Sequence, residues 1–338
     1  MGGNTTPSAG AVRYLQFVFG FLRSDEWIEY YRYYKKKEVD PLLSVSPTLR
    51  AILLQLPFIA VPTISLLLLE CGLYALLIWA AENSYISTGV AVGLISVVMF
   101  MIFTPGHDAA HGSVSSSDII NGTVGRISFF LMGPIAVFGA WRTLHLRHHK
   151  FTNDPERDPD RYACNGPTWL LPLRWFTTIS QYVVHWLSLV DEPGIISLPE
   201  KVDAVVNLSV HFAVPLICYD LGYFYQVYYY WLLPCVFCHT MLVFAFDFLP
   251  HFQHDTRPTE NRYNTTSNIE TYRVLQPLLS IILHYQNYHL SHHLYPSIPF
   301  YRYKGKWNAR REELKAKNAK TLILKLPISK PRMYRKTA

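Results

Sequence analysis

The sequence of 338 residues has few charged side chains, and long stretches of it have no basic residue. Charged residues make up 16% of the chain, whereas a soluble domain usually has about 25%. None of the 31 lysines and arginines lies between Ala51 and Gly125 or between Val202 and Thr256. A soluble fold needs charged surface along its whole length, so these gaps indicate a chain that lies in a membrane. This composition also excludes a disordered protein, collagen and a coiled coil.

Cysteine and the common cofactor motifs are equally scarce. The five cysteines include Cys235 and Cys238, which lie in an apolar run and are expected to be buried thiols instead of a zinc or redox pair. The chain has no GxGxxG motif for a flavin or nicotinamide and no CxxCH motif for haem. No cofactor of these kinds is expected.

Four apolar segments are long enough to cross a membrane as helices. They are Ala51–Ala80, Gly89–Thr104, Ala204–Tyr219 and Tyr228–Leu249, and short polar turns divide them into two pairs. A spanning helix needs about 20 apolar residues, which the first segment exceeds and the others reach with their flanking aromatic residues. The fold class predicted is a mainly α-helical integral membrane protein with four transmembrane helices in two hairpins. The shorter apolar stretch Ile127–Ala140, interrupted by Gly133 and Pro134, is expected to form a re-entrant or surface helix.

The basic residues predict the orientation in the membrane. The loops Glu82–Ser87 and Asp220–Gln226 have no lysine or arginine and so face away from the cytoplasm. We therefore expect both termini on the cytoplasmic side of a bacterial inner membrane or of the endoplasmic reticulum. The net charge of +7 then reflects orientation signals and contacts with lipid, and no nucleic-acid partner is expected.

The chain is expected to have three parts. Residues 1–50 form a cytoplasmic segment with a surface helix near Leu15–Trp27, residues 51–303 form the membrane domain, and residues 304–338 form a basic tail. The tail can attract an acidic carrier protein, or it can lie on anionic lipid.

Ten of the 14 histidines gather near the cytoplasmic ends of the predicted spans. Three boxes have helical spacing, and two more histidines follow the fourth span: His107 and His111; His145, His148 and His149; His289, His292 and His293; then His251 and His254. Residues three or four apart share one face of a helix, so the imidazoles of each box can point to one place. Eight to ten imidazoles exceed what one ion binds and suit two ions side by side in a cytoplasmic helical cap. The other four, His185, His211, His239 and His284, are expected to be ordinary hydrogen-bonding residues.

These boxes carry a resemblance to a known superfamily. The HDxxH motif at His107 and the two HxxHH motifs at His145 and His289, with two hairpins between them, resemble membrane fatty-acid desaturases and hydroxylases. Three stretches, Gly106–Asp108, Leu144–Asp160 and Gln286–Tyr303, are similar to carotenoid β-ring hydroxylases and ketolases. The resemblance implies two iron ions, molecular oxygen as co-substrate, and electrons from a separate redox protein such as ferredoxin or cytochrome b5.

The resemblance also implies a ligand set and an activity. It makes the eight box histidines metal ligands and adds one more at the inner end of the fourth span, where His251 fits best and His254 is the alternative. The activity implied is an oxygen-dependent di-iron desaturase or hydroxylase that oxidises an unactivated C–H bond of an acyl lipid or a carotenoid. A zinc-binding membrane protein, whether transporter, lipid hydrolase or inactive scaffold, is the alternative. Histidines outside the spans count against a transporter.

Carboxylates near the boxes are candidates for orienting the imidazoles. Asp108, between the first two histidines, is the leading candidate, and Asp158, Asp160 and Asp247 are others. The alternative for residues 154–160 is a solvated loop with local ion pairs. Pro155 and Pro159 are expected to end the helix that carries the second box.

Overall fold

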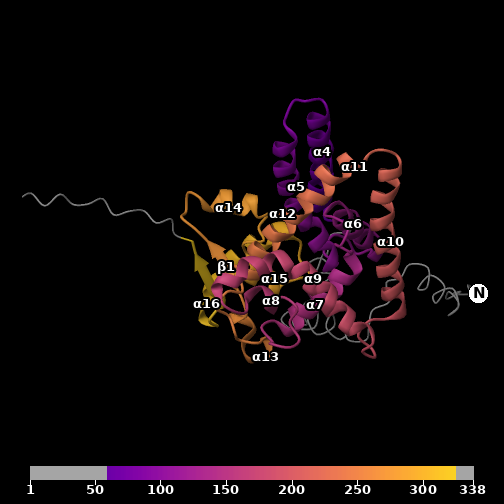
Figure 1. Ribbon diagram of the computed structural model, residues 1–338. Helices are drawn as coiled ribbons and strands as arrows, with labels where there is room; N and C mark the ends of the chain where they lie inside the picture. Colours follow the sequence, from indigo (N-terminus) through magenta and orange to yellow (C-terminus); the bar gives the residue numbers. More distant parts are fainter. Residues whose placement is uncertain (1–58, 325–338) are drawn as a thin grey trace, which may run out of the picture.

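The structure is a computed structural model that describes residues 59–324 (Figure 1). This part of the chain is mainly helical, and four helical stretches are long and apolar enough to cross a membrane. They run over Val61–Glu82, Thr88–Ala110, Leu198–Asp220 and Phe224–Phe248, which confirms the four spans and two hairpins predicted from the sequence. Residues 51–58 of the first predicted span and the predicted N-terminal surface helix lie outside the described residues.

The first hairpin joins α4 (Val61–Glu82) to α5 (Thr88–Ala110), and the two helices lie side by side in Figure 1. Helix α4 is apolar on nearly every side and buries one narrow stripe. That stripe consists of Thr63, Leu67, Glu70 and Tyr74. This spacing of three or four residues forms one helix face, which packs against α5. Most of the other side chains of α4 are exposed and apolar, as a lipid environment requires.

The second hairpin joins α10 (Leu198–Asp220) to a fourth span of mixed helical type. Ser197 and Glu200 form a capping box that begins α10. The fourth span consists of α11 (Phe224–Val227), the π-helical turn η3 (Tyr228–Leu232), α12 (Leu233–Leu242) and the π-helical turn η4 (Val243–Phe248). Helix α12 packs against α5 and so joins the two hairpins.

After the first hairpin, two separate helices lie where the sequence predicts one interrupted helix. The stretch 127–140 is divided between α6 (Asp118–Leu131) and α7 (Phe138–Phe151). The break includes Gly133, whose φ is +122° and where a Cβ would lie 2.5 Å from Cys235 Sγ. A side chain is therefore excluded at this position. Helix α7 ends at Phe151, before Pro155 as expected.

Helix α9 (Leu171–Val190) was not predicted from the sequence. Its apolar run is interrupted by Arg174, Gln181 and His185, so it does not have the pattern of a span. It packs against α7, α12 and η4. The second histidine box therefore has a long helix beside it.

The remaining elements are short, and most follow the fourth span. They are α8 (Arg161–Cys164), η2 (Thr168–Leu170), α13 (Pro258–Asn261), η5 (Arg262–Asn264), β1 (Ser267–Glu270), α14 (Gln276–Ile282), α15 (His289–Leu294), η6 (Phe300–Arg302), α16 (Tyr303–Ala316) and β2 (Lys320–Ile323). Strands β1 and β2 pair in parallel, with Ser267 opposite Lys320. Helix α16 packs on α15, so the described part of the C-terminal segment contacts the third histidine box.

Candidate metal centre

Nine buried histidines from four parts of the chain meet in two adjoining groups. The first box lies at the C-terminal end of α5, the second on α7 and the third on α15, while His251 lies in the turn after η4. The least buried of the nine, His145, exposes 8% of its surface. Helical spacing thus brings each box together, and the packing of α5, α7 and α15 brings the boxes to each other.

The first group contains five imidazoles: His107, His111, His145, His149 and His292. One ring nitrogen from each of them lies within 4.8 Å of those of the other four. The Nε2 atoms of His111 and His145 are 2.8 Å apart, as are those of His149 and His292. The Nε2 atoms of His107 and His292 are 3.1 Å apart. All three boxes contribute to this group.

The second group contains four imidazoles: His148, His251, His289 and His293. The Nε2 atom of His289 lies 2.9 Å from that of His251 and 3.1 Å from that of His293. His148 completes the group through an Nε2 distance of 3.3 Å to His293. The ring of His148 is also 5.7 Å from that of His149, its neighbour in the first group, so the two groups adjoin.

These distances fit a metal ion at each group. Two nitrogen ligands, each about 2.1 Å from one ion and at right angles to each other, lie about 3 Å apart. Two neutral imidazoles can share only one N–H between facing nitrogens, so protons alone do not satisfy a ring of four or five such atoms. Imidazole is a ligand for iron, zinc, copper and nickel. The donor set therefore fits two such ions, one for each group.

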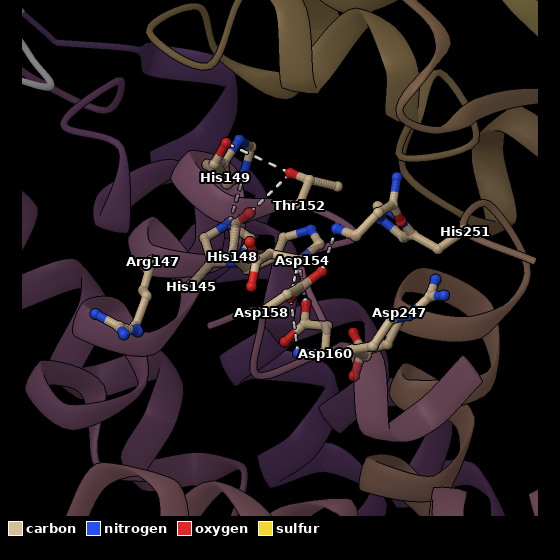
Figure 2. Close-up of polar contacts among 12 residues, drawn as sticks. His145, Arg147, His148, His149, Thr152, Asp154, Asp158, Asp160, Asp247 and His251 are labelled. Atoms are coloured by element: carbon tan, nitrogen blue, oxygen red, sulfur yellow. Dashed lines mark hydrogen bonds and ion pairs between the residues drawn. The ribbon is translucent and has the colours of Figure 1, made fainter. Parts of the chain in front are cut away.

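Aspartates behind His148 hold its ring in place. Its Nδ1 lies 2.8 Å from Asp158 Oδ1 and 3.3 Å from Asp160 Oδ2. The backbone amides of Asn153 and Asp160 donate to Asp158 at 2.7 and 3.0 Å. Figure 2 shows both carboxylates beside the His148 ring. A proton on Nδ1 leaves Nε2 free to face the second group.

Two further partners of the imidazoles come from the last part of the membrane domain. The Tyr303 hydroxyl lies 3.0 Å from Nδ1 of His292, and the Gln286 side-chain amide lies 3.3 Å from Nδ1 of His107. With Nε2 facing the group, Nδ1–H of His292 donates to the tyrosine oxygen. Neither Gln286 nor Tyr303 was predicted as a partner from the sequence, because neither has a fixed spacing from the histidine that it contacts.

Burial favours the neutral imidazoles that metal binding needs. Burial, and then the neighbouring imidazoles, hold the pKa of His149, His292 and His293 well below the usual 6.5. His148 differs, because Asp160 and Asp158 together outweigh the effect of burial and raise its pKa to about 9. The carboxylates therefore place negative charge next to the second group, where it would partly balance the charge of a cation.

Asp108 has different partners from those predicted. It is fully buried, and its carboxylate accepts hydrogen bonds from Thr63 Oγ1 at 3.0 Å and from the Phe300 amide at 3.1 Å. These bonds tie α5 to α4 and to η6. The expectation that Asp108 orients an imidazole is therefore corrected: this carboxylate joins elements, and Asp158 and Asp160 contact the imidazole.

His254 also has partners outside the two groups. Its Nδ1 lies 3.0 Å from the Asn264 carbonyl oxygen, and its Nε2 lies 2.9 Å from Ser267 Oγ. Both nitrogens are thus engaged by a backbone and a hydroxyl group. These contacts do not support the alternative in which His254 is a metal ligand. His251, in contrast, lies within the second group.

Asp247 joins a polar network beside the second box. The Tyr182 hydroxyl lies 2.6 Å from Asp160 Oδ1 and 3.0 Å from Asp247 Oδ2. Burial raises the pKa of Asp160 to about 6, against the opposing effect of His148. Figure 2 shows Asp247 on the far side of Asp160 from His148. Asp247 therefore reaches the second group through Tyr182 and Asp160.

An apolar cavity of about 570 Å³ adjoins both groups. His107, His145, His148 and His289 line one part of it. Most of the other lining residues are apolar and come from α7, α9, α10 and the fourth span. The Trp141 ring stacks on that of His145, with ring centroids 4.5 Å apart and an angle of 13° between the ring planes. The cavity can hold an apolar molecule against the imidazoles.

Comparison with known proteins agrees with this arrangement. A sequence model of the family described as fatty acid desaturase matches residues 83–322. The chain is 25% identical over 252 residues to an sn-1 oleoyl-lipid 12-desaturase of a Picosynechococcus species, with 68% of this chain and 70% of that protein covered. It is 26% identical over 230 residues to a beta-carotene ketolase of a Paracoccus species, with 66% and 80% covered.

A plant protein gives a similar match over less of its length. The chain is 26% identical over 235 residues to a chloroplastic omega-6 fatty acid desaturase of Glycine max, with 62% of this chain and 53% of that protein covered. The range that the family model matches contains all the histidines of both groups. The chain therefore belongs to the fatty acid desaturase family of membrane oxidoreductases.

Proposed function

We propose that this protein is an oxygen-dependent di-iron enzyme that desaturates or hydroxylates an unactivated C–H bond of an acyl lipid or a carotenoid. One observation carries the proposal: two adjoining groups of imidazoles line an apolar cavity among membrane helices. No amino-acid side chain has the oxidising power to break such a bond. Iron together with oxygen would supply that power.

The histidines divide naturally between two ions. His107, His111, His145, His149 and His292 would hold one iron, and His148, His251, His289 and His293 would hold the other. Ligands made only of imidazole are consistent with iron and also with zinc. The family relationship favours iron, because desaturation and ketone formation are both oxidations.

The side chains of the cavity bind and position the substrate. Apolar walls from α9 and α10 exclude water from a reactive centre and accept a hydrocarbon chain or ring. Trp141 and Phe103 flank the imidazoles on this side. The substrate carbon nearest to the histidines is the one that reacts. Its placement decides whether a second hydrogen is lost, giving an alkene, or oxygen is added, giving an alcohol.

The substrate class follows from the cavity and from the relatives. The relatives include an enzyme named for an oleoyl lipid and one named for beta-carotene. Both names describe long apolar molecules of the kind that lies within a bilayer. Electrons would come from a separate redox protein, a ferredoxin or a cytochrome b5, on the cytoplasmic side. The positive-inside rule supports both termini on that side.

Lipid and pigment profiling by mass spectrometry tests the activity. Cells that make the wild type are compared with cells that make His148→Ala, and His185→Ala on α9 serves as the control outside both groups. We expect the wild type and His185→Ala to give a product that has gained oxygen or lost two hydrogens, and His148→Ala to give none. Identical profiles for all three, with both redox proteins supplied, would contradict the proposal.

Metal analysis tests the identity of the ions. For protein purified without chelators, we expect one iron for each histidine group. Stoichiometric zinc without oxygen uptake would instead favour a zinc-binding membrane protein.

A further inference from the structure

Within the described residues, three aromatic side chains approach the imidazoles of the two groups. Trp141 and Phe103 do so from the cavity, where they stand on the side of the proposed substrate. Tyr303 does not line the cavity. It lies in a hydrophobic cluster formed by buried residues of α15, α16 and the segments next to them. Its ring centroid is 5.4 Å from that of His292, and its hydroxyl is the hydrogen-bond partner of that histidine.

A row of side chains leads from Tyr303 to the protein surface. Tyr303, Trp307 and Arg311 occupy successive turns of α16 and so share one helix face. Tyr303 and Trp307 are both 0% exposed. Trp307 Nε1 donates to Glu270 Oε1 at 3.2 Å, and the Arg311 guanidinium donates to Glu270 Oε2 at 2.7 Å.

The surface end of this row is accessible. The Arg311 side chain is 38% exposed, and its guanidinium carbon lies 5.9 Å from the centre of the Trp307 ring. The row therefore begins beside an imidazole of the first group and ends at a cation at the surface, and its two buried aromatic residues lie one helical turn apart in the same hydrophobic cluster. Packing alone requires apolar volume here, and it does not require two electron-rich aromatic rings on successive turns beside a histidine of the first group.

We propose that Tyr303 and Trp307 form the route by which electrons reach the histidine groups from a reduced one-electron carrier protein with an acidic surface. The inference rests on the proposed function, which needs an external reductant. In each transfer the carrier is oxidised by one electron and the metal centre is reduced by one. No covalent bond forms or breaks, and both aromatic side chains keep their protons, because they only couple the two redox centres.

The charge of α16 identifies the kind of partner. The helix has five cations, Lys304, Lys306, Arg310, Arg311 and Lys315, against Glu312 and Glu313. Arg310, Arg311 and Lys315 pair with Glu313, Glu270 and Glu312, and the charge that remains is positive. Lys304 and Lys315 share the face of Arg311 by helical spacing. A positive surface at the end of the row would attract and orient an acidic carrier, and this attraction would weaken with added salt.

The test measures electron transfer itself. Iron-loaded protein is mixed without oxygen with a reduced acidic [2Fe–2S] ferredoxin or with reduced cytochrome b5, and the absorbance of the carrier reports its oxidation. The same protein is reduced separately with dithionite, a small reductant that needs no docking surface. The readout is the ratio of the carrier-driven rate to the dithionite-driven rate.

We expect Trp307→Leu to lower this ratio on the order of tenfold, a change of about 1.4 kcal/mol in the transfer barrier. Trp307→Phe, which keeps an aromatic ring, should give an intermediate ratio, and Tyr303→Phe should lower it by weakening the contact with His292. Phe300→Leu is the matched control, because it removes a buried ring of the same cluster that is outside the row. It should leave the ratio unchanged.

Charge reversal tests the docking surface. Lys304→Glu with Lys315→Glu should raise the carrier concentration needed for half of the maximal rate and reduce its salt dependence. Lys150→Glu on α7 is the control at another basic surface and should change neither quantity.

Wild-type ratios in Trp307→Leu and Tyr303→Phe, at full iron content, would overturn the route. A wild type that dithionite reduces but neither carrier reduces would overturn the partner. If iron-loaded protein that dithionite has reduced oxidises no substrate once the excess dithionite is removed and oxygen is admitted, the proposed function itself fails.

Discussion

His251 and His254 are three residues apart in the chain but differ in their surroundings. The Nε2 atom of His251 lies 2.9 Å from that of His289, whereas His254 contacts Asn264 and Ser267. We therefore expect His251→Ala to lose about half of the iron, because one of the two groups is left incomplete. His254→Ala should keep its iron, although it loses some stability. Iron analysis of both purified variants checks this, and equal losses would contradict the assignment.

Asp158 supports the second group without belonging to it. Because its carboxylate fixes the ring of His148, Asp158→Asn should weaken iron binding by about 10- to 100-fold, as is usual for such partners. Asp255→Asn is the control, since its side chain is 80% exposed and pairs with Arg161 at the surface. Titration with a competing chelator measures both affinities. The same affinity in the two variants would mean that His148 is held by other contacts.

The sequence predicted the histidines better than it predicted their partners. Spacing within a box is a local property, so the helical period brings His145 and His149 onto one face before any tertiary contact forms. Tyr303 and Gln286 meet their imidazoles across 11 and 179 residues, where no period applies. Asp108 shows the converse: it lies between two histidines in sequence, but its side chain turns toward α4 and η6.

At the scale of helices, α6 and α7 pack closely where Gly125 faces Phe138. A Cβ at Gly125 would lie 2.2 Å from the Phe138 ring. Gly125→Ala should therefore destabilise the protein by about 1–3 kcal/mol, because the ring has to move and α7 with it. Thermal unfolding in detergent measures the loss, and Phe138→Leu in the same chain should recover part of it.

A second glycine provides the comparison for Gly125→Ala. Nothing lies within 4 Å of a Cβ built at Gly93 on α5. Gly93→Ala should be neutral, or stabilising by up to about 1 kcal/mol through helix propensity. If both substitutions had the same effect, close packing would not be the cause.

Length and composition predict spans well, because a bilayer imposes one strong requirement on a helix. They do not identify α9, because Arg174 and His185 interrupt its apolar run; both are half-buried, and the Arg174 guanidinium donates to the Asn165 carbonyl oxygen. The break between α6 and α7 was visible as Gly133 and Pro134, but its division into two separate helices depends on the contact with Cys235.

For the whole molecule, bound metal should contribute to stability. Nine buried imidazoles from four segments face one another, and a cation that binds only the folded protein stabilises it. At a free metal concentration about 1,000 times Kd, each ion contributes about 4 kcal/mol. Removal of metal with a chelator should lower the unfolding temperature, and iron should restore it. An unfolding temperature that does not change on metal removal would show that the groups are stable without ions.

The order of the ligands along the chain constrains how the protein is made. Each group needs at least one histidine from the third box, which ends at His293, and also histidines that precede the second hairpin. Neither group is complete until the ribosome has passed residue 293 and both hairpins have been inserted. Metal acquisition is thus expected to be a late step of biosynthesis, and a product truncated before α15 would reach the membrane without either group complete.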